Sequence, residues 1–208
     1  MTYKSDELKV SKKTVVFFDI CSSTALLEDL LRSENLVRWR NLLIQLKVFL
    51  RKRGKRIECQ PYKFQGDGWV LLFPRETSAG TLFEFLRDLT REYCITYKNN
   101  IEPVLDGDVP TAPGLTFGID CGDLIEVKMN QTWEYIGRPL NVAARLESAV
   151  GSGDEKDRKE NKGLILNSAY QKLMENGPSG LKTTVVNRTL KHVNANNRLR
   201  CRLIDFAN

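Results

Sequence analysis

Short apolar runs and helical stripes of leucine alternate along the first third of the chain. Residues 15–20 (VVFFDI) are apolar, β-branched and aromatic, which predicts a buried strand. Leucines then recur at helical spacing in 26–31 and again in 36–53, which predicts two amphipathic helices. The first of these helices has three N-cap candidates in a row, namely Ser22, Ser23 and Thr24.

A hairpin and a third helix are predicted next. Segments 56–64 and 69–73 have the composition of strands, and they flank the sequence Gly-Asp-Gly at 66–68, whose glycines permit a tight turn. Residues 78–98 then carry leucine and phenylalanine at helical spacing. The first hundred residues therefore read as strand, two helices, hairpin and helix.

The second half continues the same alternation. Residues 115–121 alternate as a strand does, 133–136 are expected to be the partner strand, and 137–150 are expected to form a short helix. The stretch 100–114 contains Pro and Gly, and 151–163 is almost wholly charged or small, so both are predicted to be loops. The remaining elements are 165–174 and terminal strands around Val185 and Leu203.

The order of these elements predicts the fold class. Strands alternate with helices, and hairpins join neighbouring strands, as in an α+β protein with helices packed on one sheet. The chain has 208 residues, which suits one such domain better than two. We therefore expect a single domain over 1–208, with the charged loop 151–163 inside it.

Histidine and cysteine are too sparse for several kinds of chemistry. His192 is the only histidine, so a Ser-His-Asp triad would have to use it, and a site with several histidine ligands cannot form. The five cysteines are scattered without a CxxC pair, which argues against a disulfide framework and against a zinc knuckle. A metal site in this chain would use hard oxygen ligands such as carboxylates.

Hydropathy and net charge limit the cellular locations and the binding partners that we expect. No run approaches the roughly 18–20 apolar residues that cross a bilayer, and the start lacks the apolar segment of a signal peptide, so we expect a cytoplasmic protein that does not enter the membrane. The net charge is +6, which attracts either nucleic acid or a nucleoside triphosphate. The densest basic run, 51–56, is interpreted as the C-terminal end of a helix, where cations suit the helix dipole. Nucleic-acid binding is therefore the weaker alternative.

Two aspartates lie at positions where a charged carboxylate costs free energy unless it binds a cation or forms hydrogen bonds. Asp19 lies at the end of the predicted buried strand, and Asp67 lies in the glycine-flanked turn. Each has an ordinary explanation, because Asp before Gly is common in turns and Asp19 could cap the following helix. If the strand and the hairpin are neighbours in the sheet, both carboxylates could bind a common pair of divalent ions, which would clamp a phosphoryl displacement.

A third candidate segment, YIGRPLNVAARL, joins a predicted strand to a predicted helix. Asn141 and Arg145 are four residues apart and so share one helix face. An amide and a guanidinium on one face suit a ribose and a pentavalent phosphorus, although an exposed helix with ordinary polar residues is the simpler interpretation.

Four segments together resemble the catalytic domain of the class III nucleotidyl cyclases, the adenylate and guanylate cyclase family. They are FFDICSSTALLE, KFQGDGWVLLF, LTFGIDCG and YIGRPLNVAARLES, in this order, and the resemblance covers about residues 13–150. It implies a ferredoxin-like, palm-type βαββαβ sheet covered by helices. It also implies cyclisation of a nucleoside triphosphate with two divalent cations, Mn²⁺ or Mg²⁺, in a homodimer whose active sites lie at the interface.

The resemblance assigns a role to each matching residue. Asp19, Asp67 and the carbonyl of Ile20 match the metal ligands, whereas Asn141 and Arg145 match the residues that orient the ribose and stabilise the transition state. The remaining substrate-binding positions follow the family pattern, with phosphates near 21–24, the base near 63 and 134–135, and a triphosphate lysine near 191. These residues are Cys21, Ser22, Ser23, Thr24, Lys63, Glu134, Tyr135 and Lys191. One subunit would supply the acids and the other would supply Lys63, Glu134, Asn141 and Arg145.

The two base-reading positions depart from the common patterns of the family. Adenylate cyclases usually carry Lys with Asp or Thr there, and guanylate cyclases usually carry Glu with Cys, whereas this chain has Lys63 with Glu134. A lysine donor and a glutamate acceptor can satisfy all four bases, so hydrogen-bond type does not decide the substrate. The longer Glu134 and the bulky aromatic neighbours would favour a smaller base if those rings face it; these neighbours are Tyr62, Trp69, Trp133 and Tyr135.

The segments FDICSST, YKFQGDGW and EYIGRPLN resemble sequences of the pyrimidine cyclases of Pycsar antiphage defence. This similarity implies a bacterial antiviral enzyme that makes cyclic UMP, or else cyclic CMP, for a separate effector that senses the cyclic nucleotide. Two alternatives stay open at this point. One is an adenylate cyclase on the same scaffold, and the other is a catalytically inactive module that binds nucleotide or nucleic acid.

Overall fold

The computed structural model describes residues 9–106, 114–129, 131–151, 160–193 and 198–207, and its first strand is longer than predicted. Strand β1 (Lys9–Ile20) begins six residues before the apolar run, in a stretch that is polar and partly exposed. This polar stretch is a strand because every residue of β1 pairs with β4 (Leu115–Met129), from Lys9 with Glu126 to Ile20 with Leu115. Pairing with a long neighbour therefore extends the strand beyond its hydrophobic part.

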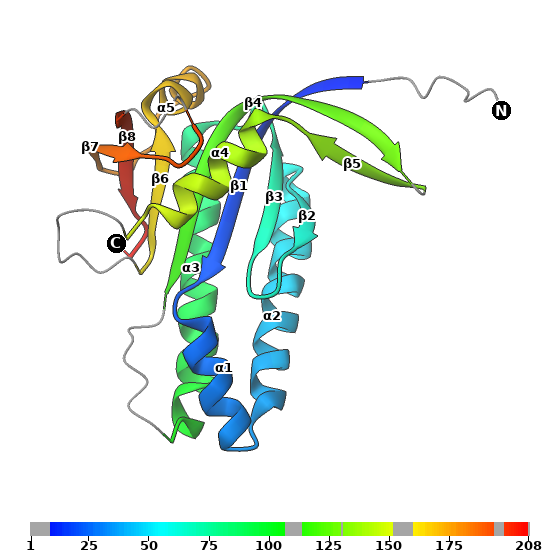
Figure 1. Ribbon diagram of the computed structural model, residues 1–208, viewed down its shortest axis with the longest axis vertical. Coiled ribbons are helices and arrows are strands. Elements are labelled where there is room, and N and C mark those ends of the chain that lie inside the picture. Colours follow the sequence, from blue (N-terminus) through cyan, green and yellow to red (C-terminus); the bar gives the residue numbers. More distant parts are fainter. Residues whose placement is uncertain (1–8, 107–113, 130, 152–159, 194–197, 208) are drawn as a thin grey trace.

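The remaining elements follow the predicted order (Figure 1). The first half contains α1 (Ser23–Arg32), α2 (Leu36–Gly54), the 3₁₀ turn η1 (Lys55–Ile57), β2 (Gln60–Phe64), β3 (Trp69–Pro74) and α3 (Ala79–Asn100). The second half contains η2 (Glu102–Val104), β4, β5 (Thr132–Ile136), α4 (Arg138–Ser148), β6 (Lys162–Leu166), α5 (Asn167–Met174), β7 (Thr183–Thr189) and β8 (Arg198–Asp205).

The sheet confirms the predicted fold class. Its strand order is β2-β3-β1-β4-β6-β8-β7, with β5 paired to β4. The first four strands are antiparallel and, with the intervening helices, form the βαββαβ unit of a ferredoxin-like fold. Strand β6 then adds in parallel to β4, and β8 and β7 extend the sheet in antiparallel fashion.

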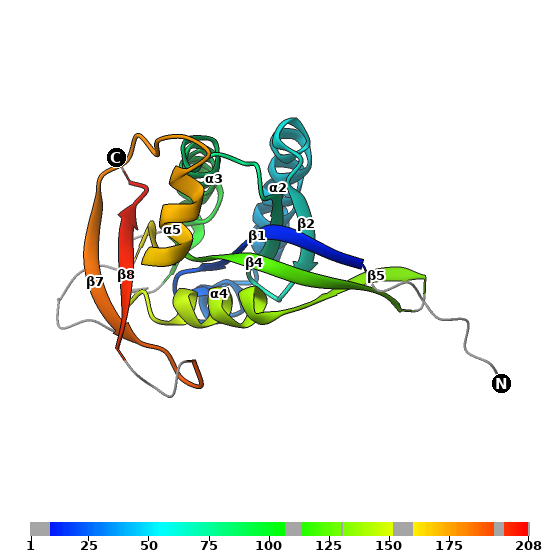
Figure 2. The same ribbon diagram turned by 90° about the horizontal axis from the view of Figure 1, so that it is seen from above.

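Helices cover both faces of the sheet, and α4 lies on the face opposite α2, α3 and α5 (Figure 2). The larger core lies under α1, α2 and α3 and contains Phe18, Phe73 and Phe117. A smaller cluster lies under α4 and contains Val15 and Leu124. Gly118 lets α4 pack directly on β4, because a Cβ at this position would lie 1.9 Å from the Ala143 carbonyl oxygen.

Strand β4 runs past the end of its pairing with β6 and forms, with β5, an arm that projects from the body of the molecule (Figure 1). The prediction had ended this strand at residue 121. Four large apolar side chains of the arm are 40–53% exposed: Ile125, Met129, Trp133 and Ile136. An arm with this much exposed apolar surface is typical of a segment that packs against another protein surface.

Several predicted boundaries were wrong for local reasons. Strand β2 begins at Gln60 rather than at 56, because Lys55–Ile57 form a 3₁₀ turn and Glu58 has a left-handed backbone. Helix α2 continues one residue beyond its predicted end at 53 and includes Gly54, where a Cβ would lie 3.2 Å from the Cβ of buried Cys59. The predicted loop 151–163 ends inside β6, and its residues 152–159 lie outside the described residues. The loop 100–114 contains η2, and its residues 107–113 likewise lie outside the described part.

A membrane-spanning helix is not found among the described residues, where none combines the necessary length with the necessary apolar character.

Candidate active site

The tip of the β2–β3 hairpin lies against the end of β1. Trp69 pairs with Phe18, and the preceding glycine, Gly68, touches the backbone of β1 so closely that a Cβ there would lie 2.0 Å from the Phe18 carbonyl oxygen. The turn is closed by a hydrogen bond from the Gln65 N–H to the Gly68 carbonyl (2.9 Å), and Gly66 has a φ of 89° that favours glycine. The glycine-flanked turn therefore places Asp67 beside Asp19.

The two carboxyl groups influence each other strongly. Burial, together with the hydrogen bond and the negative charge of the adjacent Asp67, raises the pKa of Asp19 to about 7. The charge of Glu147 acts in the same direction, while the Ile20 N–H opposes it. Asp67 also accepts a hydrogen bond from the Ser23 hydroxyl at the start of α1. Strand end, hairpin tip and helix start thus meet at one pair of acids.

Asp19 lines a cavity of about 590 Å³, and Asp67 contacts two residues of that lining, Asp19 and Ser23. The lining includes Asp19, Ile20, all of 21–24, Thr116 and Glu147, so the predicted phosphate-binding segment and the metal-binding strand end share one cavity. Ser22 has a left-handed backbone (φ 57°) that turns the chain into α1. The Cys21 N–H donates to the Gly114 carbonyl (3.0 Å), so this N–H is used within the chain. The N–H groups of Ser23 and Thr24 have no partner within the helix and are placed to bind an anion.

Glu147 was missed by the sequence analysis, although it lies in the segment that carries Asn141 and Arg145. It is half-buried at the end of α4, and its Oε1 accepts a hydrogen bond from Thr116 Oγ1 (2.6 Å) on β4. Its carboxylate adds a second negative charge to the lining of the cavity, beside Asp19. Its position two residues after Arg145 was visible in the sequence, but only the packing of α4 across β4 at Gly118 brings it to the end of β1.

Asn141 and Arg145 do not reach this cavity within one chain. Both are exposed on the outer face of α4, whereas Val142 and Leu146 on its inner face are buried. The shared face that their spacing predicted is therefore present, but it faces outward from the sheet. The acids and the Asn–Arg pair form two separate surfaces of the same molecule.

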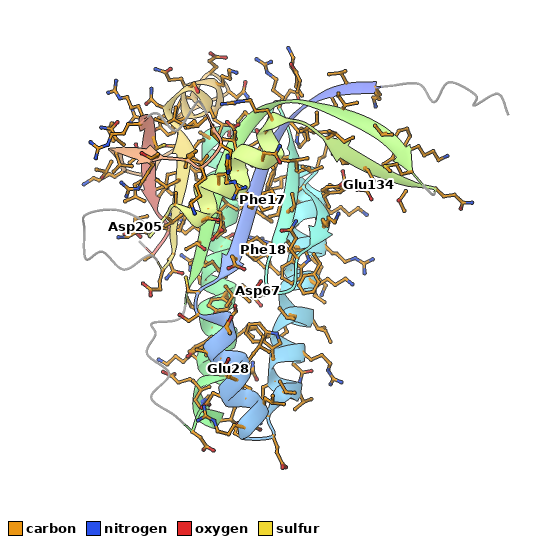
Figure 3. All side chains as sticks on the ribbon, viewed as in Figure 1. Phe17, Phe18, Glu28, Asp67, Glu134 and Asp205 are labelled. Carbon is orange, nitrogen blue, oxygen red and sulfur yellow. The ribbon has the colours of Figure 1, made fainter. Side chains whose placement is uncertain are left out.

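The three base-reading candidates lie near one another on β2 and β5. The Tyr62 hydroxyl donates to Glu134 Oε2 and accepts from the Tyr135 N–H (3.1 Å), and the two tyrosine rings meet edge to face at 5.0 Å. Tyr62 thereby links two strands that are not neighbours in the sheet, and Lys63 is the next residue of β2. Figure 3 shows Glu134 on the arm, well apart from Asp67.

The other bulky residues and Lys191 lie elsewhere. Trp69 is buried in the core against Phe18, and Trp133 is 48% exposed on the arm. Lys191 follows the C-terminal end of β7. Across the sheet, Asp19 pairs with Thr116, Thr116 with Lys162 and Lys162 with Asp205, which lies beside the start of β7. The strand ends near Asp19 are therefore opposite to the end of β7 that leads to Lys191. Like Asn141 and Arg145, Lys191 is therefore remote from the acids of its own chain.

Comparison with known proteins adds a fold assignment. No protein-family model matches the chain, and no curated protein matches it in sequence. Solved structures do match it. The adenylyl cyclase CyaB from P. aeruginosa has a TM-score of 0.68 at 19% identity, over 95% of this chain and 95% of that chain. The guanylyl cyclase Cya2 has a TM-score of 0.67 at 13% identity, over 95% and 93%.

A bacterial light-regulated adenylyl cyclase is also similar, with a TM-score of 0.71 at 16% identity. The match covers 98% of this chain and 55% of that one, so this chain spans about half the length of the light-regulated protein. These likenesses, reached at low identity, show that the chain has the fold of the class III cyclase catalytic domain.

Proposed function

We propose that this chain is a nucleotidyl cyclase, which converts a nucleoside triphosphate into its 3′,5′-cyclic nucleotide and pyrophosphate. The observation that carries the proposal is the contact of Asp67 with Asp19, which lines a cavity together with the start of α1. Within the cyclase fold, this cavity combines an acidic pair for cations with helix N–H groups for phosphates.

The acidic pair fits divalent cations. Two carboxylates whose charges repel each other, and of which Asp19 has a raised pKa, gain stability when a cation neutralises them. Their oxygens are the hard ligands that Mg²⁺ and Mn²⁺ prefer. The described residues contain no group of three or more His, Cys, Asp or Glu side chains arranged to hold a metal, so substrate phosphates and the Ile20 carbonyl would complete the ligand set.

The reaction transfers the α-phosphoryl group within one molecule. The ribose 3′-oxygen forms a bond to the α-phosphorus and loses its proton, while the bond from the α-phosphorus to the β-phosphate oxygen breaks and pyrophosphate leaves. When bound, the cations would stabilise the attacking and the leaving oxygens. Asp19 and Asp67 would hold those cations, the Ser23 and Thr24 N–H groups would bind the leaving phosphates, and Arg145 would stabilise the charge on phosphorus.

The separation of the two functional surfaces supports a homodimer. Because Asn141 and Arg145 face away from the acids of their own chain, a complete site would need the outer face of α4 from a second copy. Two apolar features are suited to such a partner. One is the projecting arm, and the other is a groove of about 660 Å³ between α2 and β2 that contains Trp39, Phe64 and Trp69.

The finer proposal is a pyrimidine substrate, with UTP favoured and CTP next, and an antiphage role for the cyclic product. It is supported by the resemblance of the FDICSST, YKFQGDGW and EYIGRPLN segments and by the contact of Tyr62 with Glu134. Because Tyr62 donates to one Glu134 oxygen, the other oxygen is the natural acceptor for a base N–H, and Lys63, next to Tyr62 on β2, would be the donor. The alternative to a pyrimidine substrate is ATP, because adenylyl cyclases have the same fold.

One assay tests both levels of the proposal. Purified protein is incubated with Mn²⁺ and each of ATP, GTP, CTP and UTP, and the products are separated and identified by mass. We expect cyclic UMP as the main product and cyclic CMP next. Cyclic AMP as the main product would replace the pyrimidine proposal, and the absence of any cyclic product from a folded, dimeric preparation would contradict the cyclase proposal.

Cation affinity should depend on pH because of Asp19. Its pKa is raised to about 7, so below that pH a bound cation must displace a proton from the carboxyl group. We therefore expect the apparent Mn²⁺ affinity to fall by up to about tenfold per pH unit as the pH drops below 7, and to level off above it. Calorimetric Mn²⁺ titrations over this pH range measure the slope. The slope should disappear in Asp19→Asn, and a flat profile in the wild type would contradict the assignment.

Tyr62→Phe should change substrate choice. It removes the hydroxyl that donates to Glu134 and accepts from Tyr135, so Glu134 loses its fixed position. We expect kcat/KM for the preferred triphosphate to fall about tenfold, with a smaller loss for the other three. Tyr170→Phe is the matched control, because its hydroxyl lies on α5 and contacts Ser179 Oγ instead (3.4 Å). An equal loss for all four triphosphates would indicate a purely structural role.

A further inference from the structure

A second polar cavity lies at the opposite end of β1 and β4 from the acidic pair. It has a volume of about 130 Å³ and lies between the start of β1, the end of β3 and helix α5. Its floor is formed by Thr14 and Cys121, which pair across the two strands and whose side chains are in contact, with Oγ1 and Sγ 3.4 Å apart. We refer to it as the basic cavity.

Cations dominate the lining of the basic cavity. Lys12, Lys13, Arg75 and Lys172 line it, against a single acidic residue, Asp123. Lys12 and Asp123 are cross-strand partners, which places one negative charge at the rim. None of the four cations takes part in an ion pair with the acidic side chains that the structure describes. Buried Asp120, next to Cys121, also interacts electrostatically with Lys172, so Asp120 and Asp123 offset part of the charge of the four cations, and the cavity keeps a net positive charge.

The floor of the cavity adds hydrogen-bonding groups without adding negative charge. The Thr14 side chain is almost completely buried and has a hydroxyl that can donate. Burial raises the pKa of the Cys121 thiol to about 11, although Lys172 and Arg75 lower it, so the thiol is neutral at physiological pH. Cationic walls over a neutral polar floor are complementary to an anion that accepts several hydrogen bonds.

We propose that the basic cavity is a binding site for a phosphate group. Its volume admits a tetrahedral oxyanion and excludes a base and ribose, so the ligand is orthophosphate, pyrophosphate or the terminal phosphate of a larger molecule that stays outside. The site is separate from the cavity of Asp19 and Asp67, and it shares no lining residue with that cavity. Its existence does not depend on the cyclase proposal, and either can fail alone.

The test is calorimetric titration of the 208-residue chain with orthophosphate, with a chelator present so that cation-dependent binding at Asp19 and Asp67 is suppressed. We expect saturable binding with one site per chain. The double variant Arg75→Gln/Lys172→Gln should weaken it at least tenfold, and Thr14→Val, which removes only the hydroxyl, should weaken it several-fold. Thermal unfolding of each variant verifies that the fold is kept.

The control variant is Arg56→Gln/Lys98→Gln, which removes the same charge from exposed positions outside the cavity. It should bind orthophosphate as the wild type does. An equal loss in both double variants would mean attraction by net charge alone and would overturn the proposal, as would a wild type without saturable binding. Parallel titrations with pyrophosphate and with UTP distinguish the source of the phosphate, since the preferred ligand is the one whose affinity falls most in Arg75→Gln/Lys172→Gln.

Discussion

Replacing Asp67 with asparagine should lower cyclic nucleotide formation by at least about a thousandfold and leave the protein as stable as the wild type or more stable. The loss is expected because one of the two proposed cation ligands becomes a neutral amide. Stability should not fall, because the substitution removes the negative charge that raises the pKa of buried Asp19. The amide oxygen can still accept the hydrogen bond from Ser23.

Two measurements on the same preparation check this prediction, namely the rate of product formation with Mn²⁺ and the midpoint of thermal unfolding. Glu28→Gln is the charge-matched control, because Glu28 is exposed on α1 and lies away from Asp67 (Figure 3). It should retain full activity. A lower unfolding midpoint together with lost activity would mean that Asp67 is a structural residue, and near-normal activity in Asp67→Asn would contradict the proposed cation site.

The acidic pair was predictable because both of its members stand in strong local patterns. The run VVFFDI specifies a buried strand that ends at an acid, and Gly-Asp-Gly specifies a turn. What the sequence could not show is how closely the turn approaches the strand. That approach depends on Gly68, whose missing side chain lets the hairpin tip contact the Phe18 carbonyl, and no local signal distinguishes this requirement from ordinary turn preference.

The parts that were not predicted depend on pairing between distant strands. The start of β1 is too polar to be identified as a strand, and it is extended only because β4 pairs with all of it. Strand β4 in turn was predicted to end at residue 121, because polar residues interrupt the apolar pattern after that point. The strand nevertheless continues and pairs with β5 to form the arm. Glu147 was missed for a related reason, since its place beside Asp19 follows from how α4 crosses β4. Local patterns do not contain such tertiary relations.

Spacing also predicted which residues share a face, but not where that face points. Asn141 and Arg145 do share the outer face of α4, four residues apart. In the single chain this face is turned away from the acids, and the register of the sheet puts Lys191 at the other edge as well. One chain therefore carries the proposed catalytic groups in two separate sets, neither of which is complete. This arrangement leads to a prediction that applies only if the sets combine between subunits.

Two inactive variants should restore activity when they form a mixed dimer. Asp67→Ala lacks an acid but keeps Arg145, and Arg145→Ala lacks the guanidinium but keeps both acids. In a mixed dimer one site combines the intact acids of one subunit with the intact Arg145 of the other, and the second site has both defects. Each mixed dimer has one working site of two, so we expect purified mixed dimers to have about half of the wild-type activity.

The measurement uses the two variants co-expressed with different affinity tags, so that mixed dimers can be purified and assayed directly. The matched control is Asp19→Asn with Asp67→Asn. Both changes affect the same set of groups, so every site in that mixed dimer lacks an acid and no activity should return. If purified Asp67→Ala/Arg145→Ala mixed dimers are as inactive as either parent, the acids and Arg145 do not act across the interface. In that case α4 of the same chain would have to turn its outer face toward Asp19, against the burial of Val142 and Leu146 in the core.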